Sequence, residues 1–173
     1  MNNERIEQTI LRNLIFNEDF TRKTLPFLKE IFFAKREEQI LFKEIDSFVQ
    51  KYKNLPTKES ILIELGNRKD INEEEHRIVK ELVNTLNNEE VEQQWLLDTT
   101  EKFCKDRAVH NAVLDGIKIL DGKDNKRTQE AIPSILADAL AVSFDNHIGH
   151  DYIGDAQARF DWYHTKEKKY KFD

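Results

Sequence analysis

Residues 89–120 read EEVEQQWLLDTTEKFCKDRAVHNAVLDGIKIL, a stretch with no proline and a single glycine, Gly116. Apolar side chains recur in it mostly at intervals of three or four residues, from Val91 and Trp95 to Ile117 and Leu120. This spacing predicts one continuous helix, which would be roughly 45 Å long at about 1.5 Å per residue. A helix of that length extends beyond what a small globule can cover.

A polar turn and a second helix follow the long one. The turn is predicted at residues 121–127, which read DGKDNKR. The next helix holds Pro133 in its first turn, where proline is tolerated, and we expect its apolar residues to point inward: Ile132, Ile135, Leu136, Ala139 and Leu140. The two helices would form an antiparallel hairpin. Because the hairpin projects beyond its globule, we expect it to need a partner, most simply a second copy of the chain.

The residues before the long helix predict a small helical head. Apolar residues share one helix face in two stretches, first Ile6, Ile10 and Leu14, then Leu41, Ile45, Phe48 and Tyr52. Pro26 predicts a break, Thr57 predicts an N-cap, and Asn72 with Glu75 has the spacing of a capping box. No stretch alternates as a strand would. The expected fold is all-α: a head over residues 1–88, the hairpin over 89–142 in the same domain, and a linker with a linker helix over 143–173.

Composition agrees with a helical protein that is not a general nucleic-acid binder. Charged residues make up 35% of the chain, with only 5 Gly and 3 Pro. The net charge is −6, whereas nucleic-acid-binding domains are usually basic. Residues 57–101 hold five Lys or Arg against twelve Asp or Glu. We therefore expect this acidic segment to face away from phosphates.

A single cysteine, Cys104, excludes an internal disulfide and a cysteine-based zinc site. We expect Cys104 to be a packed bystander rather than a reactive thiol. The first residues do not read as a signal peptide, and no apolar run approaches the length of a membrane span. The sequence thus predicts a cytoplasmic protein with no membrane partner.

Several motifs resemble the N-terminal domain of DnaB-type replicative DNA helicases, and within that family the replicative helicases of T-even-type phages. In the head the resemblance rests on residues 31–33 (IFF), 40–45 (ILFKEI) and 55–57 (LPT). In the rest of the chain it rests on EKF at 101–103, RA at 107–108, AIP at 131–133, SFD at 143–145, GHD at 149–151 and AR at 158–159. It covers most of the chain, and residues 131–159 are its most specific part.

The resemblance implies a hexameric ring helicase that unwinds DNA with ATP or GTP and Mg²⁺ bound in a RecA-like motor domain. The N-terminal domains would form a collar on the motor ring and offer a surface to primase, in the cytoplasm of a phage-infected bacterial cell. The linker helix would pack on the motor domain of a neighbouring subunit. That role would account for an apolar face on residues 150–173, made of Tyr152, Ile153, Phe160, Trp162 and Tyr163.

No nucleotide-binding motif is recognisable in this chain. Gly149 and Gly154 have the glycine spacing of a phosphate-binding loop, but Asp155 and Ala156 stand where a Lys and a hydroxyl are needed. We therefore expect no catalytic, cofactor-binding or metal-binding residue here, and little or no binding of single-stranded DNA outside the ring.

The candidate subunit interface lies on the hairpin and comprises Trp95, Phe103, Val113, Ile117, Ile135 and Leu136. Trp95 and Phe103 are eight residues apart and are expected on one helix face. They would be either ordinary core of the hairpin or aromatic anchors of a subunit contact.

Two charged groups near the end of the chain allow other interpretations. Asp145, His147, His150 and Asp151 could hold a metal, but polar linker residues are the simpler interpretation. The lysines between 166 and 171 are diluted by acidic residues, and a solvated tail explains them better than a DNA contact. The acidic clusters at 73–75 and 89–92 are most simply helix N-terminal charges, with docking of a basic partner such as primase as the alternative.

Three functions from different classes remain open at this level. The first is the collar and linker of a replicative helicase. The second is a free-standing helical adaptor or helicase-loading protein. The third is a metal-dependent hydrolase built on residues 145–151, which lacks an apparent general base or oxyanion-stabilising group.

Overall fold

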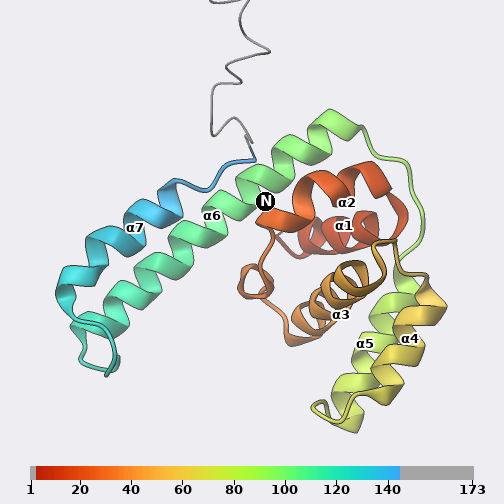
Figure 1. The fold of residues 1–173 in the computed structure, drawn as a ribbon, viewed down its shortest axis with the longest axis horizontal. Coiled ribbons are helices and arrows are strands. Elements are labelled where there is room, and N and C mark those ends of the chain that lie inside the picture. Colours follow the sequence, from red (N-terminus) through yellow and green to blue (C-terminus); the bar gives the residue numbers. More distant parts are fainter. Residues whose placement is uncertain (1–2, 145–173) are drawn as a thin grey trace, which may run out of the picture.

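The computed structural model describes residues 3–144, and in that range all regular secondary structure is helical, as the sequence predicted. The linker helix predicted within 143–173 lies outside the described residues, apart from positions 143 and 144. Figure 1 shows the arrangement of α1 (Asn3–Phe16), α2 (Glu18–Thr24), α3 (Arg36–Tyr52), α4 (Lys58–Asn67), α5 (Glu73–Thr85), α6 (Gln93–Leu120) and α7 (Ile132–Leu140). Short 3-10 turns lie at Leu25–Phe27, Glu30–Phe32 and Gln129–Ala131.

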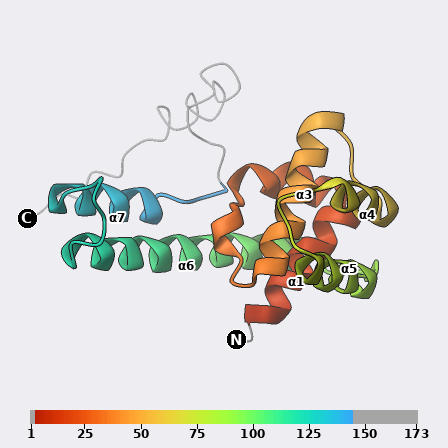
Figure 2. The same ribbon diagram turned by 90° about the horizontal axis from the view of Figure 1, so that it is seen from below.

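The head is built from α1, α2 and α3 against the first half of α6, and α4 and α5 pack beside α3 (Figures 1 and 2). Its core holds large side chains with almost no exposed surface, among them Phe20, Phe32, Phe33, Leu41, Ile45 and Leu96. Burying one such side chain contributes about 1.5–3 kcal/mol. The apolar stripes predicted from Ile10 and Leu14 and from Leu41 and Ile45 are part of this core.

Local signals in the sequence position the head helices. The Thr57 hydroxyl accepts the backbone N–H of Ser60 at 3.1 Å, and the Ser60 hydroxyl accepts that of Thr57 at 2.9 Å. Asn72 and Glu75 form the predicted capping box at the start of α5. Pro26 lies in the 3-10 turn that follows α2, as expected for a residue that cannot continue a helix.

The long helix begins at Gln93, four residues later than the sequence predicted. The carboxylate of Glu92 caps α6 by accepting the backbone N–H groups of Gln94, at 2.9 Å, and Trp95. Val91 therefore precedes the helix. With 28 residues, α6 is about 42 Å long at ~1.5 Å per residue.

The predicted polar turn ends α6 with a Schellman motif. Gly122 has φ 69°, in the left-handed region that favours glycine. Its N–H donates to the carbonyl of Ile119 at 3.1 Å, and the N–H of Lys123 donates to the carbonyl of Lys118 at 2.9 Å. The chain then returns as α7, antiparallel to α6 (Figure 1). The second half of α6 and α7 form a hairpin that projects from the head (Figure 2).

Candidate protein-interaction surfaces

Helix α6 buries two different faces along its length. In the first half, Leu96, Thr100, Phe103 and Cys104 face the head. In the second half the buried residues are small ones that face α7, namely Ala108, Ala112 and Gly116, followed by Ile119. Small side chains let two helices approach closely, and a Cβ on Gly116 would lie 3.6 Å from Ile132 Cγ2.

Apolar side chains also point outward from α6. The exposed fractions are 51% for Trp95, 47% for Val113, 49% for Ile117 and 60% for Leu120. At about 100° per residue these four positions lie within roughly 60° of one side of the helix. Val113, Ile117 and Leu120 follow one another at intervals of four and three and form a continuous strip on the projecting part. We call these three residues the outer strip.

The six residues proposed for the subunit interface differ in how exposed they are. Trp95, Val113 and Ile117 are exposed, whereas Ile135 and Leu136 are half-buried against the core between the two hairpin helices. Phe103 is a correction, because only 6% of it is exposed and its ring centroid lies 6.0 Å from that of Phe33 in the head. Eight residues turn a helix by about 800°, so Trp95 and Phe103 point roughly 80° apart.

Leu140 is a second correction. We expected it to point into the hairpin, but 71% of its surface is exposed at the end of α7. The buried position there is Ala139, which faces α6. Ala139 and Leu140 are successive residues, so their side chains point about 100° apart around α7 and only one of them faces α6. The periodicity alone therefore did not distinguish them.

The segment after α7 is held against the head by contacts that the sequence did not predict. The rings of Phe27 and Phe144 stack with centroids 4.9 Å apart. The Ser143 hydroxyl donates to Glu101 Oε1 at 3.3 Å, and Lys105 Nζ lies 2.5 Å from the same carboxylate. The hydrogen bond from Lys105, with smaller contributions from residues 143 and 144, holds the pKa of Glu101 below its usual value. The aromatic pair joins residues 117 positions apart, so no local pattern could have revealed it.

Cys104 has the buried, unreactive environment that the sequence predicted. Its side chain is fully buried in α6, and burial raises the pKa of the thiol to about 12, with a smaller contribution from Glu101. The nucleophilic form of cysteine is the thiolate. At neutral pH this residue is therefore a small apolar core residue.

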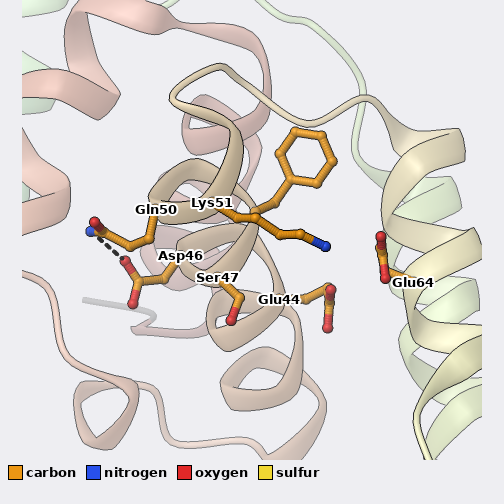
Figure 3. Close-up of a pocket in the computed structure, with 7 residues that line it drawn as sticks. Glu44, Asp46, Ser47, Gln50, Lys51 and Glu64 are labelled. Carbon is orange, nitrogen blue, oxygen red and sulfur yellow. Dashed lines mark hydrogen bonds between the residues drawn. The ribbon is translucent and has the colours of Figure 1, made fainter.

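A second surface is an open groove of about 510 Å³ on the head, between α3 and α4. Figure 3 shows its polar residues, with Lys51 and Glu44 from α3 pointing towards Glu64 of α4. Its full lining is Glu44, Asp46, Ser47, Phe48, Gln50, Lys51 and Glu64. The sequence predicts Phe48 only as part of an apolar stripe, and it gives no sign of a groove.

Residues 3–144 were also searched for metal-ligand groups and for membrane-spanning helices. In this range no group of three or more His, Cys, Asp or Glu residues could hold a metal ion, and none of its helices is long and apolar enough to cross a bilayer. The Asp145, His147, His150 and Asp151 group lies outside the described residues. So do the proposed linker-helix residues, Tyr152, Ile153, Phe160, Trp162 and Tyr163.

Sequence comparison finds a known protein that is similar to this chain over almost its full length. Over 173 aligned positions the chain is 32% identical to a protein of Enterobacteria phage T4 named "DnaB-like replicative helicase". The chain is similar to a replicative helicase. The resemblance predicted from its motifs is thereby confirmed, although no protein-family model matches the chain. The alignment covers 95% of this chain, so the head and the hairpin both contribute to it. It covers 36% of the T4 helicase, so the chain spans about a third of that relative's length.

Proposed function

We propose that this chain is the assembly module of a DnaB-type replicative helicase, and that it associates with copies of itself through the outer strip of the hairpin. The single observation that carries the proposal is the outward position of Val113, Ile117 and Leu120 on a hairpin that projects from the head. The similarity to the T4 replicative helicase supplies the context in which such association has a purpose.

Apolar side chains that stay exposed to water carry an unfavourable free energy of hydration. Burial of apolar surface is favourable by about 25 cal/mol per Å², and a second hairpin offers a matching strip of the same shape. A two-fold contact uses the same patch on both copies, so one strip on the chain is sufficient. The intervals of four and three residues suit helix-to-helix packing of this kind.

In this proposal the chain works within a larger machine. The parent protein unwinds DNA in a hexameric ring, and its motor domain holds ATP or GTP with Mg²⁺ and performs the hydrolysis. The collar formed by copies of this chain sets the geometry of the ring and gives primase a surface on which to dock. The isolated chain turns over no nucleotide, and measurable ATP hydrolysis by the purified chain would contradict the assignment.

The test is light scattering coupled to size-exclusion chromatography over a wide range of concentration. The variant combines Val113→Glu with Ile117→Lys, which leaves the net charge unchanged. The wild-type chain should self-associate, and the variant should raise the dissociation constant at least about tenfold, because each aliphatic side chain contributes ~1.5–3 kcal/mol when buried.

The matched control places the same pair of charges on two exposed apolar residues of the head, Ile63→Glu with Tyr52→Lys. It should associate as the wild-type chain does. If the wild-type chain is a monomer at every concentration, or if both double variants weaken association equally, the outer strip is not the assembly surface. Circular dichroism of all three proteins shows whether a variant has lost its helical fold.

A further inference from the structure

A groove lies on the hairpin itself, between α6 and the end of α7. Its volume is about 460 Å³, and its lining residues are Lys105, Asp106, Val109, His110, Ala139 and Leu140. The apolar ones range from the buried Ala139 through the half-buried Val109 to Leu140, which is 71% exposed. We call this feature the hairpin groove. Leu140, whose exposure the sequence did not predict, is part of it.

The hairpin groove opens on the same side of α6 as the outer strip. At about 100° per residue, Asp106, Val109 and His110 point within roughly 60° of the middle of the strip. Val109 and Val113 are four residues apart, so they are neighbours on the helix surface. The outer strip and the hairpin groove therefore form one continuous surface, which runs from the tip of the hairpin towards the head.

The outer strip alone is too small for a stable contact between two copies. A typical protein–protein interface buries about 800 Å² of each partner and involves roughly 20–30 residues a side. The strip has three residues, so a contact centred on it must extend over the neighbouring surface of the hairpin. The hairpin groove adjoins the strip on the side towards the head, and an extended contact would cover it.

The two ends of this surface differ in shape, and the difference selects the orientation of two copies. At the tip, Leu120 projects with 60% of its surface exposed, whereas the other end is hollowed by the groove. In a parallel contact groove would face groove, and unfilled space forfeits packing contacts. In an antiparallel contact with Val113 opposite Ile117, Leu120 of each copy lies opposite position 110 of the other, beside the groove.

We propose that two copies of the chain pack their hairpins antiparallel, and that Leu120 of each copy inserts into the hairpin groove of the other, against Val109 and Leu140. This inference rests on the proposed function, because it requires association through the outer strip. It adds the orientation of the two copies and the residues that meet. Each copy presents both the projecting leucine and the groove, so one two-fold contact fills both grooves.

Disulfide trapping tests the orientation. The variants Leu120→Cys and His110→Cys are mixed at a concentration at which the chain self-associates, with oxidised glutathione as the oxidant. The mixture should form a disulfide-linked pair that contains one chain of each kind. Neither variant alone should be linked, because identical positions are then about 15 Å apart along the helix axis, and a disulfide needs Cα atoms within about 7 Å. The natural Cys104 is buried and does not compete.

Parallel packing would give the opposite result. Each variant alone would then be linked, and the mixture would contain no mixed pair, which would overturn the inference. The control mixes Leu120→Cys with Ile63→Cys, which is exposed on α4 of the head and should not be linked. An equal yield of linked pairs with Ile63→Cys and with His110→Cys would mean that the disulfides report random collisions, and it would also count against the proposed orientation.

Alanine variants test whether Leu120 contacts Leu140 of the other copy. Leu120→Ala and Leu140→Ala should each raise the dissociation constant about fivefold in light scattering. The double variant should raise it by less than the product of the two effects, because both changes remove one shared contact. The control, Leu114→Ala, removes the same side chain from an exposed position about 90° away from the outer strip and should associate as the wild type does. Equal weakening by Leu140→Ala and the control would exclude the groove from the contact.

Failure of this inference is distinguishable from failure of the proposed function. If the wild-type chain is a monomer at every concentration, both are overturned. If Val113→Glu with Ile117→Lys weakens association but no disulfide joins positions 110 and 120, the outer strip is still the assembly surface. The hairpin groove would then have another occupant, such as the chain's own residues beyond 144 or a different protein, and the antiparallel pairing would be wrong.

Discussion

Glu38 is the residue whose environment is least expected from its chemistry. It is fully buried in the first turn of α3, and neither carboxylate oxygen has a well-formed hydrogen bond. Burial raises its pKa to about 7, the carboxylate of Glu7 adds to the rise, and Lys35 opposes it. Glu7 itself is buried and accepts the backbone N–H of Ala34 at 2.8 Å. Two acidic groups from α1 and α3 thus share the core of the head.

This arrangement predicts a pH-dependent stability. The folded state holds a proton on Glu38 more tightly than the unfolded chain does, so this group's contribution falls as the pH rises from about 4.5 to about 7. Between pH 5 and pH 8 the loss should be about 2 kcal/mol. Glu38→Gln removes the charge and should be the more stable protein at pH 8, as measured by urea unfolding at both values.

Other carboxylates titrate in both proteins. The informative quantity is therefore the difference in unfolding free energy between the variant and the wild type at each pH. Glu59→Gln, at an exposed position on α4, should keep the wild-type dependence. If the unfolding free energy of Glu38→Gln changed with pH as steeply as that of the wild-type chain, Glu38 would not bind its proton more tightly in the folded state.

At the scale of the element, α5 depends on its capping box. Asn72 Oδ1 accepts the N–H of Glu75 at 2.8 Å, and Glu75 Oε2 accepts the N–H of Asn72 at 3.0 Å. That backbone hydrogen bond, followed by one from Arg36, holds the pKa of Glu75 below its usual value. Asn72→Ala should cost about 1 kcal/mol of unfolding free energy. The control is Asn84→Ala, at an exposed position on the same helix, which should leave the unfolding free energy almost unchanged. An equal loss of unfolding free energy in both variants would show that the cap at Asn72 is not the cause.

At the scale of the whole molecule, the contacts of residues 143 and 144 attach the end of α7 to the head. Phe144→Ala removes the ring that stacks on Phe27, a pairing worth about 1 kcal/mol. Amide exchange in α7 should become about fivefold faster, because the end of α7 loses its attachment to the head. Exchange in α3, which lies away from this contact, is the internal control. Equal acceleration in both helices would indicate general destabilisation instead.

Much of the fold was predictable because its signals are local. The helices, the N-cap at Thr57, the capping box at Asn72, the turn at 121–127 and Pro133 in the first turn of α7 each depend on a few neighbouring residues. The assembly surface itself stays a prediction. Val113 and Ile117 are exposed on the hairpin, whereas Phe103 belongs to the core and Leu140, which was expected to point inward, is exposed.

The sequence by itself determined that α6 is long and carries apolar residues on more than one side. It also determined that a polar turn reverses the direction of the chain after α6. Tertiary structure alone decided which side is buried, because the head packs on one face of its first half and α7 packs on another face of its second half. The spacing of apolar residues shows which face of a helix is apolar, but it does not show which other element packs against that face. In the second half the true contact uses Ala108, Ala112 and Gly116, which are small enough for close approach, and the larger side chains of the outer strip are left facing solvent.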